Sequence, residues 1–279
     1  MYKFLIYQIK QVKKFGFKIL ILKLYNFAKL SFYLPGIMLV PILLPLIYIF
    51  SPFILIRFSK IQSDRIGYLA GSMKIYLCNK DFKLDIPNGI YFDLFCTNNM
   101  ICNKFFLHKL SKKIIIIPRF FLDPFIISNK YLAIYIPNLK KHHEVDSGTS
   151  DVHGLLGKHA PILSFTEKED NKGTSFLRSI GIKRNDKFVC IHVRDSGYLK
   201  HIHPKGSWSH HDFRDADIDT YSDAILEIIN RGYFVIIMGV YNSKKISINN
   251  KMLIDYTSSN NRSDFLDVYL SSKCFFLLS

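Results

Sequence analysis

The second half of the chain has the clearest pattern of apolar and polar positions. Short apolar runs predict strands at KFVCIHV, YFVIIM, MLIDYT and CFFLL, between positions 187 and 278. Between them, DIDTYSDAILEIINRG and NRSDFLDVYLSSK carry apolar residues at a helical period. The run YFVIIM is almost wholly apolar, which is typical of a parallel strand buried on both faces. This alternation predicts a doubly wound parallel α/β sheet.

The region from 61 to 165 also alternates apolar runs with polar breaks, and NMICNKFFLHKLSKK has a helical period. It is followed by KKHHEVDSGTSDVHGLLGKHA, a polar stretch with four histidines that we expect to be a connecting loop near a domain boundary. The sequence therefore predicts an N-terminal α/β domain at 61–165 and a second one at 166–279. Because the chain stops at Ser279, at the end of a predicted strand, we expect the second domain to be incomplete; a short sheet or a partner chain is the alternative.

The segment from 1 to 60 has a different pattern. Residues 30–56, LSFYLPGIMLVPILLPLIYIFSPFILI, contain no charge and are numerous enough to cross a bilayer. The residues before them contain seven lysines and no acid, which is typical of a helix on an anionic membrane surface. Four prolines interrupt the uncharged run, and basic residues flank it on both sides: Lys29 before it, and Arg57, Lys60 and Arg65 after it. These features favour a re-entrant hairpin with both ends cytoplasmic over a single span or a buried core helix.

The net charge of +16 would suit a nucleic-acid binder, but its distribution argues against one. Residues 1–65 hold ten Lys or Arg and one acid, so +9 of the +16 lies beside the membrane-like segment. We therefore expect a membrane partner and no nucleic acid. The five cysteines include no C-x-x-C pair, which indicates buried thiols in a reducing compartment rather than a disulfide framework.

Polar residues gather where the predicted strands of the second domain end. His192, Arg194 and Asp195 close the first strand, Gly239 closes the second, and Arg262 lies at the start of the last helix. Open α/β sheets bind ligands at this carboxyl edge. Arginine forks and free N–H groups at a helix start bind phosphate, so the pattern predicts a nucleotide-diphosphate ligand.

Other interpretations of the same residues remain open. His192 could be a buried histidine bonded to backbone, and each arginine could form an ion pair with a nearby aspartate: Arg194 with Asp195, Arg214 with Asp215 and Arg262 with Asp264. The long loop after the first strand also holds four histidines that could bind a metal in a hydrolase: His201, His203, His210 and His211. Their spacing lacks a tight zinc motif, so we predict no metal and no cofactor.

Several blocks, in order, resemble a bacterial family of glycosyltransferases from surface-polysaccharide gene clusters. These blocks are SDRIGYLAGSMKIYL, CIHVRDSGYL, HHDFRDADIDTYSDAI, GYFVIIMG and IDYTSSNNRSDFLDVYL. More remotely, the H-x-R feature looks like that of fucosyltransferases. The resemblance implies a GT-B-like fold of two Rossmann-like domains with a cleft between them. The chain departs from the family pattern at Ile237, where an arginine is usual, and it lacks the helices that follow in the family.

By this resemblance, the chain is a membrane-associated glycosyltransferase at the cytoplasmic face of the inner membrane. It would move a sugar from a nucleotide-diphosphate donor to a surface-glycan or lipid-linked acceptor bound on the 61–165 side. Arginines would neutralise the leaving diphosphate, and Asp195 or Asp212 would deprotonate the acceptor. The alternative is a non-catalytic, membrane-anchored remnant or scaffold. The residues expected to bind the donor are His192, Arg194, Tyr198, His211, Arg214, Gly239, Arg262, Ser263 and Asp264.

Overall fold

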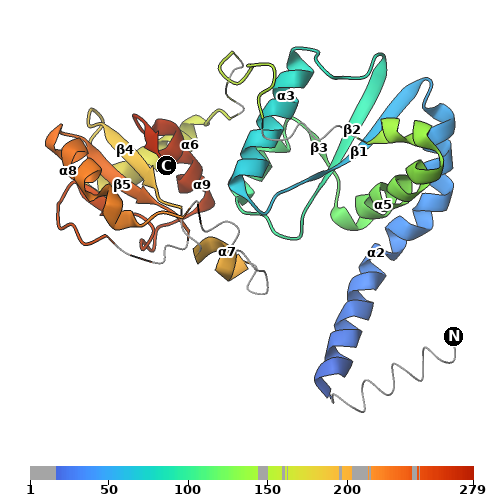
Figure 1. The fold of residues 1–279 in the computed structure, drawn as a ribbon, viewed down its shortest axis with the longest axis horizontal. Coiled ribbons are helices and arrows are strands. Elements are labelled where there is room, and N and C mark those ends of the chain that lie inside the picture. Colours follow the sequence, from blue (N-terminus) through green and yellow to red (C-terminus); the bar gives the residue numbers. More distant parts are fainter. Residues whose placement is uncertain are drawn as a thin grey trace. The chain divides into compact units, whose positions relative to one another are not determined.

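The chain forms two compact units, Met1–Ile162 and Leu163–Ser279, in a computed structural model (Figure 1). The structure describes residues 17–143, 150–158, 161, 163–194, 197–202, 213, 215–240, 244 and 246–279. Both units are mixed α/β folds with parallel sheets. This confirms the expected fold class at that level.

Unit 1 is built around a parallel sheet with the order β1-β2-β3. The π-helical turn η1 leads directly into α3, and Asn103 caps the start of α4. The 3-10 helix η2 is the last helical element described in this unit. The helix predicted around 99–113 is confirmed as α4. The elements are α2 (Phe17–Phe50), β1 (Ile54–Ile61), η1 (Gly67–Ser72), α3 (Met73–Asp81), β2 (Ile90–Thr97), α4 (Lys104–Leu110), β3 (Ile115–Ile116), α5 (Arg119–Tyr135) and η2 (Pro137–His142).

Helices α2 and α5 cover the same face of this sheet. Leu44 of α2 and Leu122 of α5 share one buried cluster with Phe58 of β1 and Cys96 of β2. Figure 1 shows the two helices side by side, with the amino-terminal part of α2 extending beyond the sheet. On the opposite face, Tyr76 of α3 lies edge-on against Phe95 of β2.

The uncharged run at 30–56 does not form a hairpin. It is divided between α2, which is one continuous helix despite Pro35, Pro41 and Pro45, and β1, which starts at Ile54. Within the described residues, one helix is long and apolar enough to cross a membrane, through Ser31–Phe50. Its surface facing α5 is buried and much of the rest is exposed.

Two of the basic residues expected to flank a membrane hairpin have partners inside unit 1. Arg57 is buried and donates to both carboxylate oxygens of Asp93 across the β1–β2 pair, at 2.6 and 2.8 Å. Lys60 donates to Asp123 of α5. These two charges therefore satisfy carboxylates within the fold, and they give no argument for membrane orientation.

Unit 2 is a four-stranded parallel sheet with the order β6-β5-β4-β7. The four strands predicted from the sequence are present, although the last comprises two residues. Val189 and Ile191 of β4 pack against Ile225 of α8, whereas Cys190 donates to a carbonyl of α9, so helices cover both faces. The elements are α6 (Glu167–Ser179), β4 (Phe188–His192), α7 (Gly197–Ile202), η4 (Ile218–Tyr221), α8 (Ser222–Asn230), β5 (Phe234–Met238), β6 (Leu253–Asp255), α9 (Asp264–Lys273) and β7 (Leu277–Leu278).

The first and last helices of unit 2 meet at one tight contact. The ring of Tyr269 on α9 lies directly over Gly173 of α6, where an added Cβ would overlap the ring. The Tyr269 hydroxyl donates to the Asp170 carbonyl at 3.3 Å. Glycine at 173 leaves room for this packing, which fixes α9 against the body of unit 2.

Candidate functional site

Three strands of unit 2 end at the same edge and bring predicted donor residues there. His192 is the last residue of β4, Gly239 follows β5, and Arg262 lies between β6 and α9. The paired register of His192 with Met238 places the ends of β4 and β5 level. Because β5 lies between β4 and β6, these two outer strands are about 10 Å apart, with β5 and Gly239 between them. Gly239 has φ of +153°, a backbone conformation that side chains rarely adopt.

Arg194 lies just beyond β4 and is held beside Asp215. Its Nε is 3.8 Å from Asp215 Oδ1, and about a third of its side chain is exposed. The backbone N–H of Ala216 donates to the Arg194 carbonyl at 2.9 Å, which ties the two chain segments together. His192 is exposed rather than buried, so the interpretation of it as a core histidine is wrong. Arg194 therefore pairs with Asp215, whereas Asp195, the partner that the sequence suggested, lies outside the described residues.

Arg262 has both a carboxylate partner and an unsatisfied donor. It donates to Asp267 Oδ2 at 2.7 Å, rather than pairing with Asp264 as one interpretation of the sequence had it. Its Nε is buried and has no acceptor among the described residues. Burial raises the pKa of Asp267, even though the charge of Arg262 opposes that rise. One terminal nitrogen of Arg262 is therefore fixed by Asp267, while its Nε keeps a donor without an acceptor among the described residues.

The loop that carries Arg262 is ordered by its neighbours. Asp255, the last residue of β6, accepts from the Thr257 and Ser258 hydroxyls, each at 2.5 Å. Tyr256 is fully buried and accepts from the Ser263 backbone N–H at 3.0 Å, while Ser263 caps α9 by accepting from a backbone N–H in its first turn. Burial raises the pKa of Tyr256, which keeps the phenol neutral. Ser263 therefore acts as a helix cap at this edge.

The structure places some of the other predicted residues and not others. Tyr198 lies in α7 and Asp264 in the first turn of α9, both partly exposed. His201, one of the possible metal ligands, lies in α7 and is exposed. The remaining candidates lie outside the described residues: Asp195, His203, His210, His211, Asp212 and Arg214. Among the described residues no group of three or more His, Cys, Asp or Glu is placed to hold a metal ion, and the five cysteines are free thiols.

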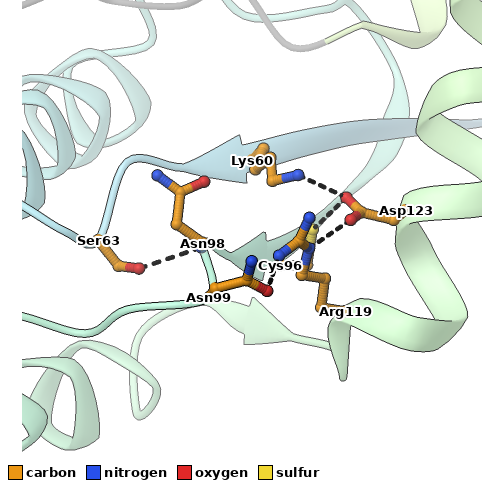
Figure 2. Close-up of polar contacts among 7 residues, drawn as sticks. All are labelled: Lys60, Ser63, Cys96, Asn98, Asn99, Arg119 and Asp123. Atoms are coloured by element: carbon orange, nitrogen blue, oxygen red, sulfur yellow. Dashed lines mark hydrogen bonds and ion pairs between the residues drawn. The ribbon is translucent and has the colours of Figure 1, made fainter. Parts of the chain in front are cut away.

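A second polar cluster, which the sequence did not predict, lies at the carboxyl edge of the sheet in unit 1. Figure 2 shows Asp123 of α5 between Lys60, near the end of β1, and Arg119, at the start of α5. Lys60 Nζ is 2.8 Å from one carboxylate oxygen, and Arg119 Nε donates to the other. A second nitrogen of Arg119 donates to the side-chain oxygen of Asn99, which follows β2. We call Lys60, Asn99, Arg119 and Asp123 the edge cluster.

The electrostatics of the edge cluster keep Asp123 ionised. Burial raises its pKa, but hydrogen bonds and charges from Lys60 and Arg119 outweigh burial and leave the pKa below its ordinary value. Cys96 donates its thiol to the same carboxylate at 3.7 Å, and burial raises the pKa of that thiol to about 12. The carboxylate is buried, whereas Lys60 and Arg119 keep about a third and a quarter of their side chains exposed. The exposed side of the cluster is therefore cationic.

A neighbouring pair shapes the same edge. Ser63, after β1, accepts from the Asn98 backbone N–H at 3.0 Å and donates to the Met100 carbonyl at 2.7 Å, as Figure 2 shows in part. Asn98 in turn donates to Asp64 at 2.8 Å. These bonds link the loops after β1 and β2. The sequence signal for the cluster was Arg119 and Asp123, four positions apart at a helix start after an apolar run.

No protein-family model and no curated protein sequence matches the chain. Among solved structures, it is similar to the E. coli ADP-heptose LPS heptosyltransferase II, with 11% sequence identity and a TM-score of 0.32. The alignment covers 66% of this chain and 64% of that one, so it spans less than two thirds of the heptosyltransferase. At this TM-score, the likeness assigns no residue of the chain a role.

Proposed function

We propose that the chain is a glycosyltransferase that takes a sugar from a nucleotide-diphosphate donor and passes it to a glycan or lipid-linked acceptor. The proposal rests on the sequence blocks and on one structural observation. Arg194 and Arg262 follow β4 and β6, the two strands that flank β5, and the carboxyl ends of such strands form the edge where open α/β sheets bind ligands.

The chemistry of a diphosphate suits this arrangement. Gly239 lets the backbone at the end of β5 approach a ligand without a side chain in the way. Arg262 could give its buried Nε, which has no acceptor among the described residues, to a phosphate oxygen. As the sugar leaves the donor, negative charge grows on the diphosphate, and fixed cations stabilise it without reorganising. Arginines supply that charge, so the proposal requires no metal or cofactor.

The other predicted donor contacts stay part of the proposal. They are His192, Tyr198, His211, Arg214, Ser263 and Asp264. The general base remains Asp195 or Asp212. Asp123 is a poorer base, because Lys60 and Arg119 hold its pKa low.

We assign the acceptor to unit 1, at the edge cluster. The exposed sides of Lys60 and Arg119 are cationic, and the Asp123 carboxylate orients both. Such a surface suits an acceptor with a phosphate or carboxylate group. The enzyme would act at the cytoplasmic face of the inner membrane, where nucleotide sugars are available.

Calorimetry on the full chain with GDP and with UDP tests the donor site. Arg262→Ala and Arg194→Ala should each weaken binding by about 10- to 150-fold, the equivalent of one charge-assisted hydrogen bond. The lysine variants should recover part of this loss, because an ammonium cannot bond two oxygens in parallel. Arg231→Ala is the matched control, because Arg231 is an exposed arginine between the end of α8 and the start of β5, at the opposite edge of the sheet, where it pairs with Glu227.

Two outcomes would go against the proposal. If both alanine variants bind nucleotide as tightly as the parent chain and remain folded by circular dichroism, the arginines are structural and the donor site lies elsewhere. If the folded parent chain binds neither nucleotide, the scaffold interpretation replaces the enzymatic one.

A further inference from the structure

Unit 1 has an unusual apolar surface on the outer side of α2 and α5. Both helices bury one side against the same face of the sheet, so their opposite sides are both turned away from it. Those sides are apolar. We call them the outer face, and each of the following defining residues exposes between 52% and 69% of its surface: Met38, Ile42, Ile49, Ile127, Tyr131 and Ile134.

The spacing of these residues follows the helical period. Ile127, Tyr131 and Ile134 lie four and then three positions apart, so they share one side of α5. Met38, Ile42 and Ile49 lie four and then seven positions apart, which also places them on one side of α2. A soluble protein does not ordinarily leave two adjacent apolar helix faces in water, so this surface calls for a partner.

The charges near the outer face indicate what that partner is. Lys130 of α5 is exposed, and so are Lys140 and Lys141 of η2, the element that follows α5 in the chain. From Pro124 to His143 the sequence contains no acid, and the residues before position 30 add seven lysines. Apolar residues beside a surplus of lysines match a bilayer with anionic headgroups. Tyr131 adds an aromatic ring with a polar tip, which suits the boundary between headgroup and hydrocarbon.

The packing of α2 argues against a simple crossing of the bilayer. Gly36 fits so closely against α5 that an added Cβ would come within 2.5 Å of the Phe120 carbonyl. Further along, the Tyr48 hydroxyl donates to Asn129 of α5 at 2.7 Å. From Gly36 to Tyr48 the contact runs for about 18 Å of a segment about 30 Å long.

A spanning α2 would therefore take α5 into the membrane with it. The first turn of α5, beside Gly36, carries Arg119 and is bonded through Asp123 to Lys60. Charged side chains cost about 2.5 to 3.5 kcal/mol each at the centre of a bilayer, even on the scale that gives the lowest cost. A helix lying along the surface avoids this cost, because the edge cluster then stays in water.

We propose that unit 1 lies on an anionic bilayer as a monotopic body, with the outer faces of both α2 and α5 in the headgroup–hydrocarbon boundary. The inference does not depend on glycosyl transfer, since it concerns neither the nucleotide nor unit 2. It makes α5 a second membrane-contacting helix, beside the long apolar helix that sequence alone points to.

Vesicle flotation of the full chain tests the α5 contact. Vesicles of phosphatidylcholine with phosphatidylglycerol should bind it more strongly than vesicles of phosphatidylcholine alone. A triple variant, Ile127→Asn, Tyr131→Ser and Ile134→Asn, should lower partitioning by at least about tenfold. The matched control carries three changes at exposed apolar residues outside the outer face, Phe82→Ser, Val152→Asn and Leu226→Asn, and should float like the parent chain.

A second measurement needs no variant of the outer face. Epitope tags at the two ends of the chain should be protected together when spheroplasts of an expressing bacterium are treated with protease, and cut together after lysis. Cleavage of one tag alone in intact spheroplasts would show that α2 crosses the membrane and would overturn the proposal. So would unchanged flotation of the folded triple variant, or self-association in the absence of vesicles that the triple variant abolishes, since the outer face would then bind a second copy.

Discussion

Replacing Asp123 with asparagine tests whether the edge cluster is held together by charge. The substitution keeps the size of the side chain and removes its negative charge, leaving Lys60 and Arg119 facing a neutral amide. Each charge-assisted hydrogen bond contributes about 1.5 to 3 kcal/mol. Because Lys60 and Arg119 keep about a third and a quarter of their side chains exposed, water can replace part of what they lose. We therefore expect a loss of about 2 to 3 kcal/mol in the free energy of unfolding of unit 1.

The pH dependence of that loss identifies its cause. Asp123 has a pKa below its ordinary value of 3.8, so it binds fewer protons when folded than when unfolded near that pH. Its stabilising contribution is therefore fully present above about pH 4 and is lost as the pH falls through the folded pKa. The difference between the parent chain and Asp123→Asn should be constant from about pH 5 to 7, on this reasoning, and should shrink below about pH 4.

Urea unfolding followed by circular dichroism at several pH values measures both effects, and a thermal scan adds a third. At neutral pH the melting temperature should fall by about 4 to 12 °C for a unit of this size. Asn99→Ala provides a milder comparison, because it removes the neutral partner of Arg119 and leaves the carboxylate in place. A loss below about 0.5 kcal/mol at pH 7 would refute the reasoning, as would a larger loss that stays the same down to the lowest pH at which the parent chain is folded.

Three further predictions concern the packing of unit 1, each measured by urea unfolding. Gly36→Ala should destabilise unit 1 by about 1 to 3 kcal/mol, because its Cβ meets a carbonyl of α5, whereas Gly71→Ala, in open space, should not; equal effects would contradict this. Burial lowers the pKa of His142, so the parent chain should lose stability as the pH falls below about 6.5, and His142→Gln should reduce that slope; an unchanged slope would mean that other groups cause it. Asp93→Asn should lower the free energy of unfolding by about 3 to 5 kcal/mol, because it leaves the buried charge of Arg57 without a counter-charge. The double change Arg57→Met with Asp93→Leu should lower it by less; an equal loss would contradict the idea that the unpaired charge causes the effect.

The sequence predicted unit 2 well because the boundaries between its strands and helices are clearly marked. Apolar runs there are short and separated by polar, helix-period segments, so β4, β5 and α9 were located within a few residues. The shared carboxyl edge followed from the expectation that the strands are parallel. Which side chains pair with one another did not follow, because Arg194 finds Asp215, and Arg262 finds Asp267, through loop geometry that no motif encodes.

Unit 1 was harder to predict because its strongest signal is ambiguous. The uncharged run at 30–56 contains no charged residue to mark where α2 ends and β1 begins, and periodicity cannot separate a buried strand from a helix in such a run. The run YLAIYIP, which could be a strand, lies largely in α5. His142, expected in a polar loop, is fully buried and bonded to a carbonyl of β1 at 2.7 Å.

The edge cluster was missed for a similar reason. Lys60, Asn99 and Arg119 come from three separate segments, and only the parallel pairing of β1, β2 and β3 brings the ends of those segments together. A charge next to an apolar run was interpreted as a membrane flank, although the same residue at a strand end can serve a binding edge.

The contact between Gly173 and Tyr269 has a consequence for how the protein is made. The Tyr269 hydroxyl shares hydrogen bonds with partners 95 and 99 positions earlier in the chain, so α6 has no α9 to pack on until nearly all of unit 2 has been synthesised. At ordinary rates of translation that delay is about 5 to 20 s. During this interval the surface of α6 around Gly173 is not covered by Tyr269, so chaperones and proteases can reach it. The segments that build unit 1 have by then already left the ribosome. Slow codons placed after α6 should therefore lower the yield of folded chain more than the same codons placed after α9.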